Sequence, residues 1–138
     1  MNKEEIIKFL NDHPVSFLAT IEGDQPRVRG MSIVKADELG VLYQTSDMKD
    51  VWRQVEGGRK VEACFNDLLT NTQVRITGVV EIVEDQAIKA EIVAKRPFLK
   101  GLVEKSGYGP IKVFRITRCK AYAWTMEKNF APKEYVEF

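Results

Sequence analysis

The sequence is poor in the residues that most catalytic centres use. It has one histidine, His13, and two cysteines, Cys64 and Cys119, which lie far apart in apolar segments. No serine or cysteine is placed to form a nucleophile–base pair with His13, and no cluster of metal ligands occurs, so hydrolase and metalloenzyme functions gain no support. Neither a Walker loop nor a Gly-x-Gly-x-x-Gly fingerprint is present. We expect both cysteines to be free thiols in a reducing cytosol.

Long apolar runs and a strong excess of charge are also missing. No segment could span a membrane, and the acidic start of the chain lacks the apolar part of a secretory signal, so we expect a cytoplasmic protein. The formal net charge of +1 disfavours a general nucleic-acid binder, although Arg27, Arg29 and Arg75 could still converge into a local basic patch. The chain length and the 44% hydrophobic content suit a single globular domain over residues 1–138.

The order of the hydrophobic patterns predicts a mainly β protein. Helical spacing and capping residues predict helices over 3–12, 47–56 and 86–95, with Asn2, Ser46 and Asp85 as N-caps. Period-two alternation predicts strands over 15–21, 27–35, 41–45, 60–65, 72–83 and 111–126. Residues 97–110 are expected to be irregular. Because consecutive strands lack crossover helices, we expect a six-stranded antiparallel β-barrel, closed or partly open, with flanking α-helices covering its ends.

The most informative segment runs from Gln25 to Gln73, and its centre is a predicted strand-to-helix turn. Backbone N–H groups at a helix start attract phosphate, and the hydroxyls of Thr45 and Ser46 could add donors there. Lys49 would contribute a full charge within the first helical turn. The alternative is an ordinary serine cap beside a solvated lysine, which is the commoner situation for such residues taken alone.

Two arginines share one face of the predicted strand 27–35. Arg27 and Arg29 could grip an anion with their planar guanidinium groups, or they could simply keep a strand edge soluble. The next residue, Gly30, is typical of a place where a ligand or another backbone approaches closely. Gly30, Met31 and Ser32 could therefore lay main-chain groups against a flat ring.

Two further residues are candidates for contact with a planar ligand. Gln73 shares a strand face with Arg75 and Thr77, and its amide suits the polar edge of a heterocycle, although for this residue alone the water-facing side of a strand is the favoured explanation. Trp124, near the end of the last predicted strand, could stack on a cofactor or pack in the core or in a subunit interface.

Taken in order, these motifs resemble the pyridoxamine 5'-phosphate oxidase-like family of FMN-binding split barrels. The resemblance covers nearly the whole chain and rests on the order and spacing of five segments, namely Phe17–Thr20, Pro26–Met31, Leu42–Lys49, Val61–Phe65 and Gln73–Gly78.

The resemblance implies a homodimer with two FMN sites at the subunit interface. Arg29 corresponds to the family arginine that approaches the FMN phosphate. The segment of Gly30, Met31 and Ser32 corresponds to the strand along the isoalloxazine ring. The turn and helix start that hold the phosphate correspond to Thr45, Ser46 and Lys49. Gln73 matches a position that touches the flavin from a neighbouring strand, and Trp124 a late aromatic residue near the ring.

The sequence also departs from the oxidases that give the family its name. Their C-terminal segment is rich in arginine and histidine and recognises the substrate, whereas no arginine or histidine follows Arg118 here. Met48 stands where the oxidases usually have arginine, which leaves one phosphate charge fewer. Oxidation of pyridoxamine phosphate is therefore not expected, and the likeness is closer to the short bacterial members.

The leading hypothesis is an FMN-dependent oxidoreductase that acts on a small-molecule substrate or NAD(P)H, bound over the exposed ring face near Trp124 or residues 97–110. No residue is assigned as a catalytic acid. The alternative is a non-catalytic sensor or carrier module that binds flavin or haem. A single-stranded nucleic-acid binder that uses Arg27, Arg29 and Arg75 is a third class, which the near-neutral charge disfavours. The sequence leaves open the substrate and whether a related flavin or deazaflavin replaces FMN.

Overall fold

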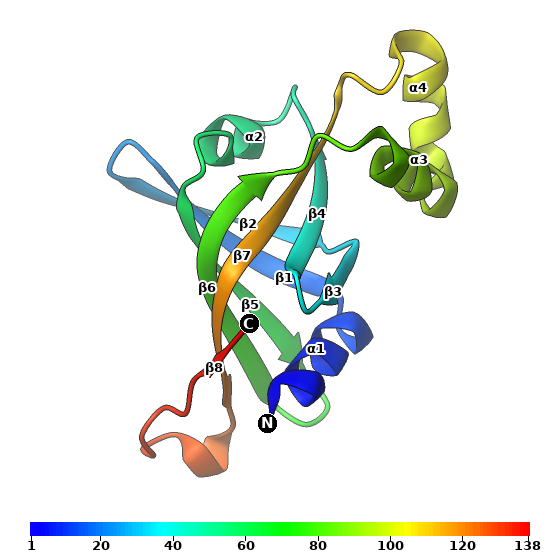
Figure 1. Cartoon of the computed structure of the whole chain (residues 1–138). Helices are drawn as coiled ribbons and strands as arrows, with labels where there is room; N and C mark the ends of the chain where they lie inside the picture. The colour runs from blue at the N-terminus through cyan, green and yellow to red at the C-terminus, as the bar shows by residue number, and fades with distance from the viewer.

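A computed structural model describes all residues from 1 to 138 and shows one strongly curved antiparallel sheet with helices around it (Figure 1). The sheet has eight strands in the order β2-β1-β5-β6-β7-β4-β3, and β8 pairs with the free stretch of β7. Their bounds are β1 Val15–Glu22, β2 Gln25–Ser32, β3 Lys35–Asp37, β4 Gly40–Ser46, β5 Lys60–Asp67, β6 Thr72–Ile82, β7 Ile111–Trp124 and β8 Val136–Glu137.

The predicted mainly β class is confirmed, but the strand count is eight rather than six. The predicted strand 27–35 is interrupted after Ser32. Ile33 N still donates to Pro14 O opposite it, but Pro14 has no N–H to return a bond, and Val34 N donates to Leu42 O instead. The polar end of the chain adds β8, where Val136 pairs with Ala121 of β7. Short strands of this kind carry too few residues for an alternation pattern to reveal them.

The helices are α1 (Lys3–Asp12), α2 (Asp50–Val55), α3 (Gln86–Lys95) and α4 (Lys100–Ser106), with single 3₁₀ turns η1 (Pro97–Leu99) and η2 (Met126–Lys128). The predicted caps of α1 and α3 are confirmed. Asn2 and Glu5 form a reciprocal capping box with both hydrogen bonds at 2.8 Å, and Asp85 accepts from Ala87 N at 2.9 Å. None of the helices has the length and apolar content needed to cross a membrane.

Two predictions about helices are wrong. Residues 97–110 are not irregular, because Pro97 ends α3 and begins η1, which continues directly into α4. The second helix does not begin at Asp47 with Ser46 as its N-cap: α2 begins at Asp50, and Lys49 is the N-cap residue. The sheet holds the chain up to that point, since Ser46 pairs with Ile111 and Asp47 N donates to Pro110 O at 3.1 Å.

Two apolar cores lie on opposite faces of the sheet. The larger fills the inside of the curved sheet and includes Leu10 of α1, Val55 of α2, Tyr43 and Phe114. The smaller lies where α3 and α4 cover the outer face of β4 and the start of β7, around Ile92. Figure 1 shows α3 and α4 together on one side, away from α1 and α2. The outer face of β1, β5 and β6 has no helix over it.

The pattern of β1 is inverted relative to an ordinary half-buried strand. Its inward residues are Ser16, Leu18 and Thr20, all buried, whereas Val15 and Phe17 on the outer face are 56% and 50% exposed. The Ser16 hydroxyl donates to Met31 O at 2.8 Å and accepts from the Tyr43 hydroxyl at 2.7 Å. Burial raises the pKa of Tyr43 above its ordinary value, so this hydroxyl is a neutral donor. Polar contacts therefore fix β1, and an apolar strip is left outside.

The two cysteines are free thiols, as predicted. Cys119 is buried inside the curved sheet, and burial raises the pKa of its thiol to about 12. Cys64 is half-buried on the outer face of β5, between Phe17 and Arg75 in the neighbouring strands.

Candidate functional site

Arg29 ties together β1, β2 and α2. It faces Leu18 across the β1–β2 pair and so points to the inner side of the sheet. Its Nη1 donates to Leu18 O at 3.1 Å and to Thr20 Oγ1 at 2.8 Å, and its Nη2 donates to Gln54 Oε1 on α2. Partial burial, and after it the charge of Arg27, lowers the pKa of Arg29 below its ordinary value. An arginine remains protonated at physiological pH even so, and this charge is held rigidly.

An open pocket of about 450 Å³ lies between the β1–β2 hairpin and α2, which stand side by side in Figure 1. Its volume is in the range of small-molecule sites, about 300–1,000 Å³. We call it the hairpin pocket; it is lined by Glu22, Arg27, Val28, Arg29, Lys49, Asp50, Val51 and Gln54. The structure thus brings Arg29 and Lys49, two of the predicted phosphate-binding residues, to one place.

The charges of the hairpin pocket are unevenly compensated. Arg27 forms an ion pair with Glu22 at 3.1 Å, and Asp50 forms one with Arg53. Hydrogen bonds from Gln54 and Arg27 lower the pKa of Glu22 below its ordinary value, so this carboxylate is ionised. Arg29 donates its side-chain hydrogen bonds only to neutral acceptors, and the side chain of Lys49 forms no hydrogen bond or ion pair. Two cations without a carboxylate partner make the pocket attractive to an anion.

Thr45 and Ser46 lie at the end of β4 rather than in the lining of the pocket. Ser46 Oγ accepts from Met48 N at 3.3 Å and shapes the turn before α2. Thr45 Oγ1 is buried and has no hydrogen-bond partner, which leaves its bonding capacity unused. Since α2 starts three residues later than predicted, Lys49 precedes the helix instead of lying in its first turn. Its contribution to the pocket is the charge of its side chain. A phosphate contact of Thr45 or Ser46 stays a prediction.

Gly30, Met31 and Ser32 lie on the edge of the sheet. They pair with Phe17, Ser16 and Val15 of β1, and the other side of β2 has no neighbouring strand. A Cβ built on Gly30 would meet Phe17 Cε1 at 3.9 Å and Ser16 O at 4.0 Å, which are ordinary contacts. The packing of the chain itself therefore does not require glycine at this position, and the space beside the backbone is open.

Arg96, which the sequence analysis missed, anchors the end of this edge strand. It follows α3 and donates from Nη1 to Gln44 Oε1 at 3.0 Å and from Nη2 to Ile33 O at 3.0 Å and Ser32 O at 3.4 Å. Its position directly before Pro97 indicates a helix end, but no local signal reveals its distant partners. Gln54 was missed as well, although a glutamine three residues from Val51 and one from Val55 on a short apolar helix was a usable signal.

Gln73 and Trp124 do not join the hairpin pocket. They pair with each other across β6 and β7 on the outer face, whereas Arg29 points to the inner side of β2, beyond β1 and β5. Gln73 Oε1 accepts from Arg75 Nη2 at 3.1 Å. Arg75 therefore lies on the outer face too, so within one chain Arg27, Arg29 and Arg75 do not form the local basic patch that the sequence left open.

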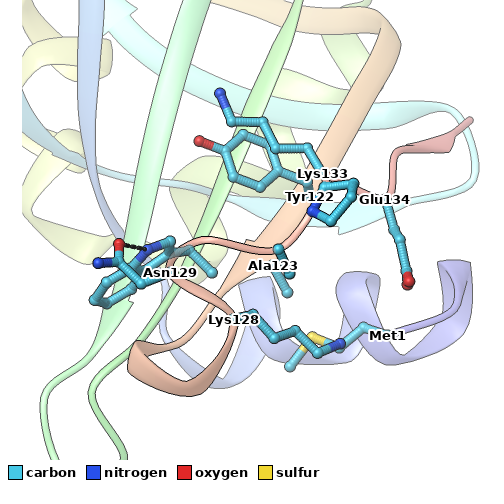
Figure 2. A pocket seen from close by; sticks show the side chains of 10 residues that line it. Met1, Tyr122, Ala123, Lys128, Asn129, Lys133 and Glu134 are labelled. Carbon is cyan, nitrogen blue, oxygen red and sulfur yellow. Dashed lines mark hydrogen bonds between the residues drawn. The ribbon is translucent and has the colours of Figure 1, made fainter.

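Trp124 lines a small pocket beneath the C-terminal tail, drawn in Figure 2. Its Nε1 donates to Asn129 Oδ1 at 3.0 Å, and Met1, Tyr122 and Lys133 form other parts of the wall. The volume of about 120 Å³ is well below the range of about 300–1,000 Å³ that is usual for small-molecule sites. Within one chain, Trp124 does not form a cofactor site.

Comparison with known protein families gives one clear result. The sequence model of the family described as pyridoxamine 5'-phosphate oxidase matches residues 3–124. A curated relative, the pyridoxine/pyridoxamine 5'-phosphate oxidase of Agrobacterium fabrum (strain C58), is 31% identical over 96 residues, which are 69% of this chain and 46% of that protein. The chain thus spans less than half the length of the curated relatives it matches.

Solved structures show the same fold. A NimC/NimA family protein from Clostridium acetobutylicum superposes with a TM-score of 0.78 at 24% identity, covering 98% of this chain and 92% of that one. HutZ from Vibrio cholerae, described as a haem storage protein, superposes with a TM-score of 0.58 at 18% identity, covering 85% and 90%. At these identities the likeness concerns the fold alone.

Proposed function

Because this chain belongs to the pyridoxamine 5'-phosphate oxidase family, we propose that it is an FMN-binding flavoprotein and that Arg29 and Lys49 hold the phosphate of the cofactor. The observation that carries this proposal is the pair of uncompensated cations in one open pocket. Hydrogen bonds between a guanidinium or ammonium group and phosphate are among the strongest in proteins. The hydroxyl of Thr45, buried without a partner, is a further donor close to the turn that carries Lys49.

The neighbouring edge strand suits the ring of the flavin. Its backbone at Gly30, Met31 and Ser32 is open on one side, and the contacts of Ser16 and Arg96 hold two of its carbonyl groups in place. A glycine that internal packing does not require supports close approach of a flat ligand. When bound, FMN supplies electron and hydride transfer at its ring, and the protein supplies binding, orientation and electrostatics.

A second copy of the chain would complete the site. Gln73 and Trp124 lie too far across the sheet to reach a flavin on β2 of their own chain. The exposed apolar residues Val15, Phe17 and Val28 form a strip on the outer face of β1 and β2, and such strips mark protein contacts. A homodimer formed over this strip would offer the Gln73 and Trp124 of one copy to the flavin of the other, giving two sites at the interface.

The pocket favours flavin over haem. A haem iron requires an axial histidine, cysteine, methionine or tyrosine, and no such residue lines the hairpin pocket. The single histidine, His13, lies at the end of α1, with its ring centroid 4.5 Å from that of Phe9 and its Nε2 3.8 Å from Asp67 Oδ2. The hairpin pocket therefore contains cations for an anion but no residue that could be the axial ligand of a haem iron.

The test of cofactor binding is a visible absorption spectrum of the purified protein, followed by titration of the stripped protein with FMN. We expect a yellow protein that rebinds about one FMN per chain and elutes as a dimer in size-exclusion chromatography with light scattering. Riboflavin, which lacks the phosphate, is the matched control ligand and should bind more weakly. A colourless protein that does not bind added FMN contradicts the proposal.

We further propose that the bound flavin exchanges electrons with a small-molecule substrate or NAD(P)H, although pyridoxamine phosphate is not the expected substrate. Met48 stands beside Lys49, where an arginine would add a further charge for phosphate. Anaerobic stopped-flow mixing with NADPH or NADH should bleach the flavin band faster than it bleaches free FMN at the same concentration. Equal rates with protein-bound and free FMN would instead favour a carrier or sensor without turnover.

A further inference from the structure

Gln54 is the one polar side chain among the buried residues of α2, the helix beside the β1–β2 hairpin (Figure 1). Only 5% of its surface is exposed, and its neighbours Val51 and Val55 belong to the larger core. A buried polar group destabilises a protein unless hydrogen bonds satisfy it. The position of this amide therefore calls for an explanation, which its contacts at the hairpin pocket supply.

The amide of Gln54 connects three polar side chains of the hairpin. Its Oε1 accepts from Thr20 Oγ1 at 2.6 Å and from Arg29 Nη2, and its Nε2 donates to Glu22 Oε2 at 3.1 Å. These partners determine which way the amide is turned. The reverse orientation would set N–H against N–H at Arg29 and oxygen against the carboxylate of Glu22. Glu22 thus fixes the amide, and the amide fixes Arg29.

The hydrogen bonds of Arg29 leave one edge of its guanidinium group free. Thr20 Oγ1 accepts from Nη1 and Gln54 Oε1 accepts from Nη2. Because these two oxygens are only 2.6 Å apart, they lie together at the end of the group that carries both η nitrogens. The other N–H of Nη1 donates to Leu18 O. Of the five N–H groups of an arginine, those left are the N–H of Nε and one N–H of Nη2, a pair that suits two parallel hydrogen bonds to a phosphate.

The lack of charge on Gln54 is as important as its orientation. An amide oxygen holds Arg29 in place and leaves its positive charge uncompensated. A carboxylate at the same place would form an ion pair with Arg29 and would repel a phosphate. Arg27, on the same hairpin, does have such a partner in Glu22. The hairpin therefore has one arginine that a carboxylate compensates and one whose charge is available to a ligand.

We propose that Gln54 is a positioning residue of the anion site: it fixes the guanidinium group of Arg29 with its free edge and its charge available to a phosphate. This inference rests on the proposed function, in which the phosphate is that of FMN. Gln54 lines the hairpin pocket, but it is almost fully buried and its Oε1 already accepts from two donors. It therefore acts through Arg29, and it increases the preference of the site for a phosphorylated flavin over an unphosphorylated one.

The competing explanation is that Gln54 only fastens α2 to the hairpin. The two roles predict different results for Gln54→Glu. The introduced carboxylate loses the hydrogen bond to Glu22, but it keeps an acceptor for Arg29 and Thr20 and so preserves the link between α2 and the hairpin. It also compensates the charge of Arg29, which only the positioning role makes harmful to phosphate binding.

The test is titration of the stripped protein with FMN and with riboflavin, followed by flavin fluorescence. We expect Gln54→Glu to weaken FMN binding at least about tenfold and riboflavin binding less than about threefold. Gln54→Met, which keeps the length of the side chain without its hydrogen bonds, should weaken FMN binding about tenfold, again with a smaller effect on riboflavin. Gln86→Glu, in the exposed first turn of α3, is the matched control and should leave both affinities unchanged.

A double-mutant cycle tests whether Gln54 acts through Arg29. In a protein that already carries Arg29→Ala, Gln54→Met should change the affinity for FMN less than about twofold, because the side chain that it positions is gone. Urea unfolding of the same samples shows whether each variant is folded. The two substitutions of Gln54 report independently, so the unfolding of one leaves the other as the test.

Three results would overturn the inference. One is a preference for FMN over riboflavin that neither substitution of Gln54 lowers, and another is an equal loss of both flavins in Gln54→Met. The third is an undiminished effect of Gln54→Met in the protein with Arg29→Ala. A wild-type protein that binds FMN no better than riboflavin would instead contradict the phosphate site itself, so failure of the inference is distinguishable from failure of the proposed function.

Discussion

Gly40→Ala is expected to lower the free energy of unfolding by about 4 kcal/mol. Gly40 begins β4 with φ +123°, and a Cβ added there would lie 2.0 Å from Ile116 O of the paired strand β7. The backbone conformation strains any other residue by about 1–3 kcal/mol, and overpacking adds about 1–3 kcal/mol or more. The contact is with backbone, so relief requires opening the β4–β7 ladder at the centre of the fold. A total near 4 kcal/mol is a large part of the ~5–15 kcal/mol that stabilises a typical domain.

Urea unfolding followed by tryptophan fluorescence measures this effect as a lower midpoint at an unchanged slope. Gly101→Ala is the matched control. Gly101 lies in α4, has an ordinary φ and nothing within 4 Å of an added Cβ. Alanine there should raise the free energy of unfolding by about 0.5–1 kcal/mol, because it favours helix. Equal midpoints for Gly40→Ala and the wild type would show that β4 approaches β7 less closely than described.

The second large effect is expected at Arg29. Arg29→Ala should weaken FMN binding by about 10- to 100-fold, since hydrogen bonds between charged groups contribute about 1.5–3 kcal/mol and each 1.4 kcal/mol is tenfold in affinity. Flavin fluorescence quenching during titration of the stripped protein measures it. Arg29 also bonds to Leu18, Thr20 and Gln54, so a general loosening of the pocket must be separated from loss of the phosphate contact.

Riboflavin makes that separation. If Arg29 binds the phosphate, Arg29→Ala should lower the affinity for FMN far more than that for riboflavin, and the preference for FMN should largely disappear. Lys8→Ala, which removes an equal charge from the solvent-exposed face of α1, should leave both affinities unchanged. A variant that loses FMN and riboflavin to the same extent would show that Arg29 only supports the local structure.

Sequence patterns correctly predicted those features of the fold that depend on contacts between residues close together in the sequence. Asn2 and Asp85 cap helices through partners two or three residues away, so their sequences suffice. The order of closely connected strands predicted the class, since only an antiparallel sheet allows such short links. The break after Ser32 and the late start of α2 depend on bonds to Leu42 and Pro110, which are distant or lie on another strand. No pattern within either segment contains that information.

The candidate site divides in the same way. Arg29, Gly30 and Lys49 belong to short motifs, and the two charged residues among them do line one pocket. Gln54 and Arg96 act on partners 25 and 52 or more residues away, and no local pattern identifies those partners. The face that Gln73 shares with Arg75 was predictable from alternation. The distance of this face of β6 from β2 was not predictable, because alternation does not give the order of strands in a sheet.

The inverted pattern of β1 has a consequence for how the chain folds. If β1 slid by one residue, Val15, Phe17 and Ile21 would move inside and Ser16 and Thr20 outside, an arrangement that apolar burial alone prefers. The native alignment is selected instead by the contacts of Ser16 with Tyr43 and of Thr20 with Gln54. A one-residue register shift of β1 therefore competes with the native register during folding. The few hydroxyl and amide groups that form these hydrogen bonds disfavour the shifted register.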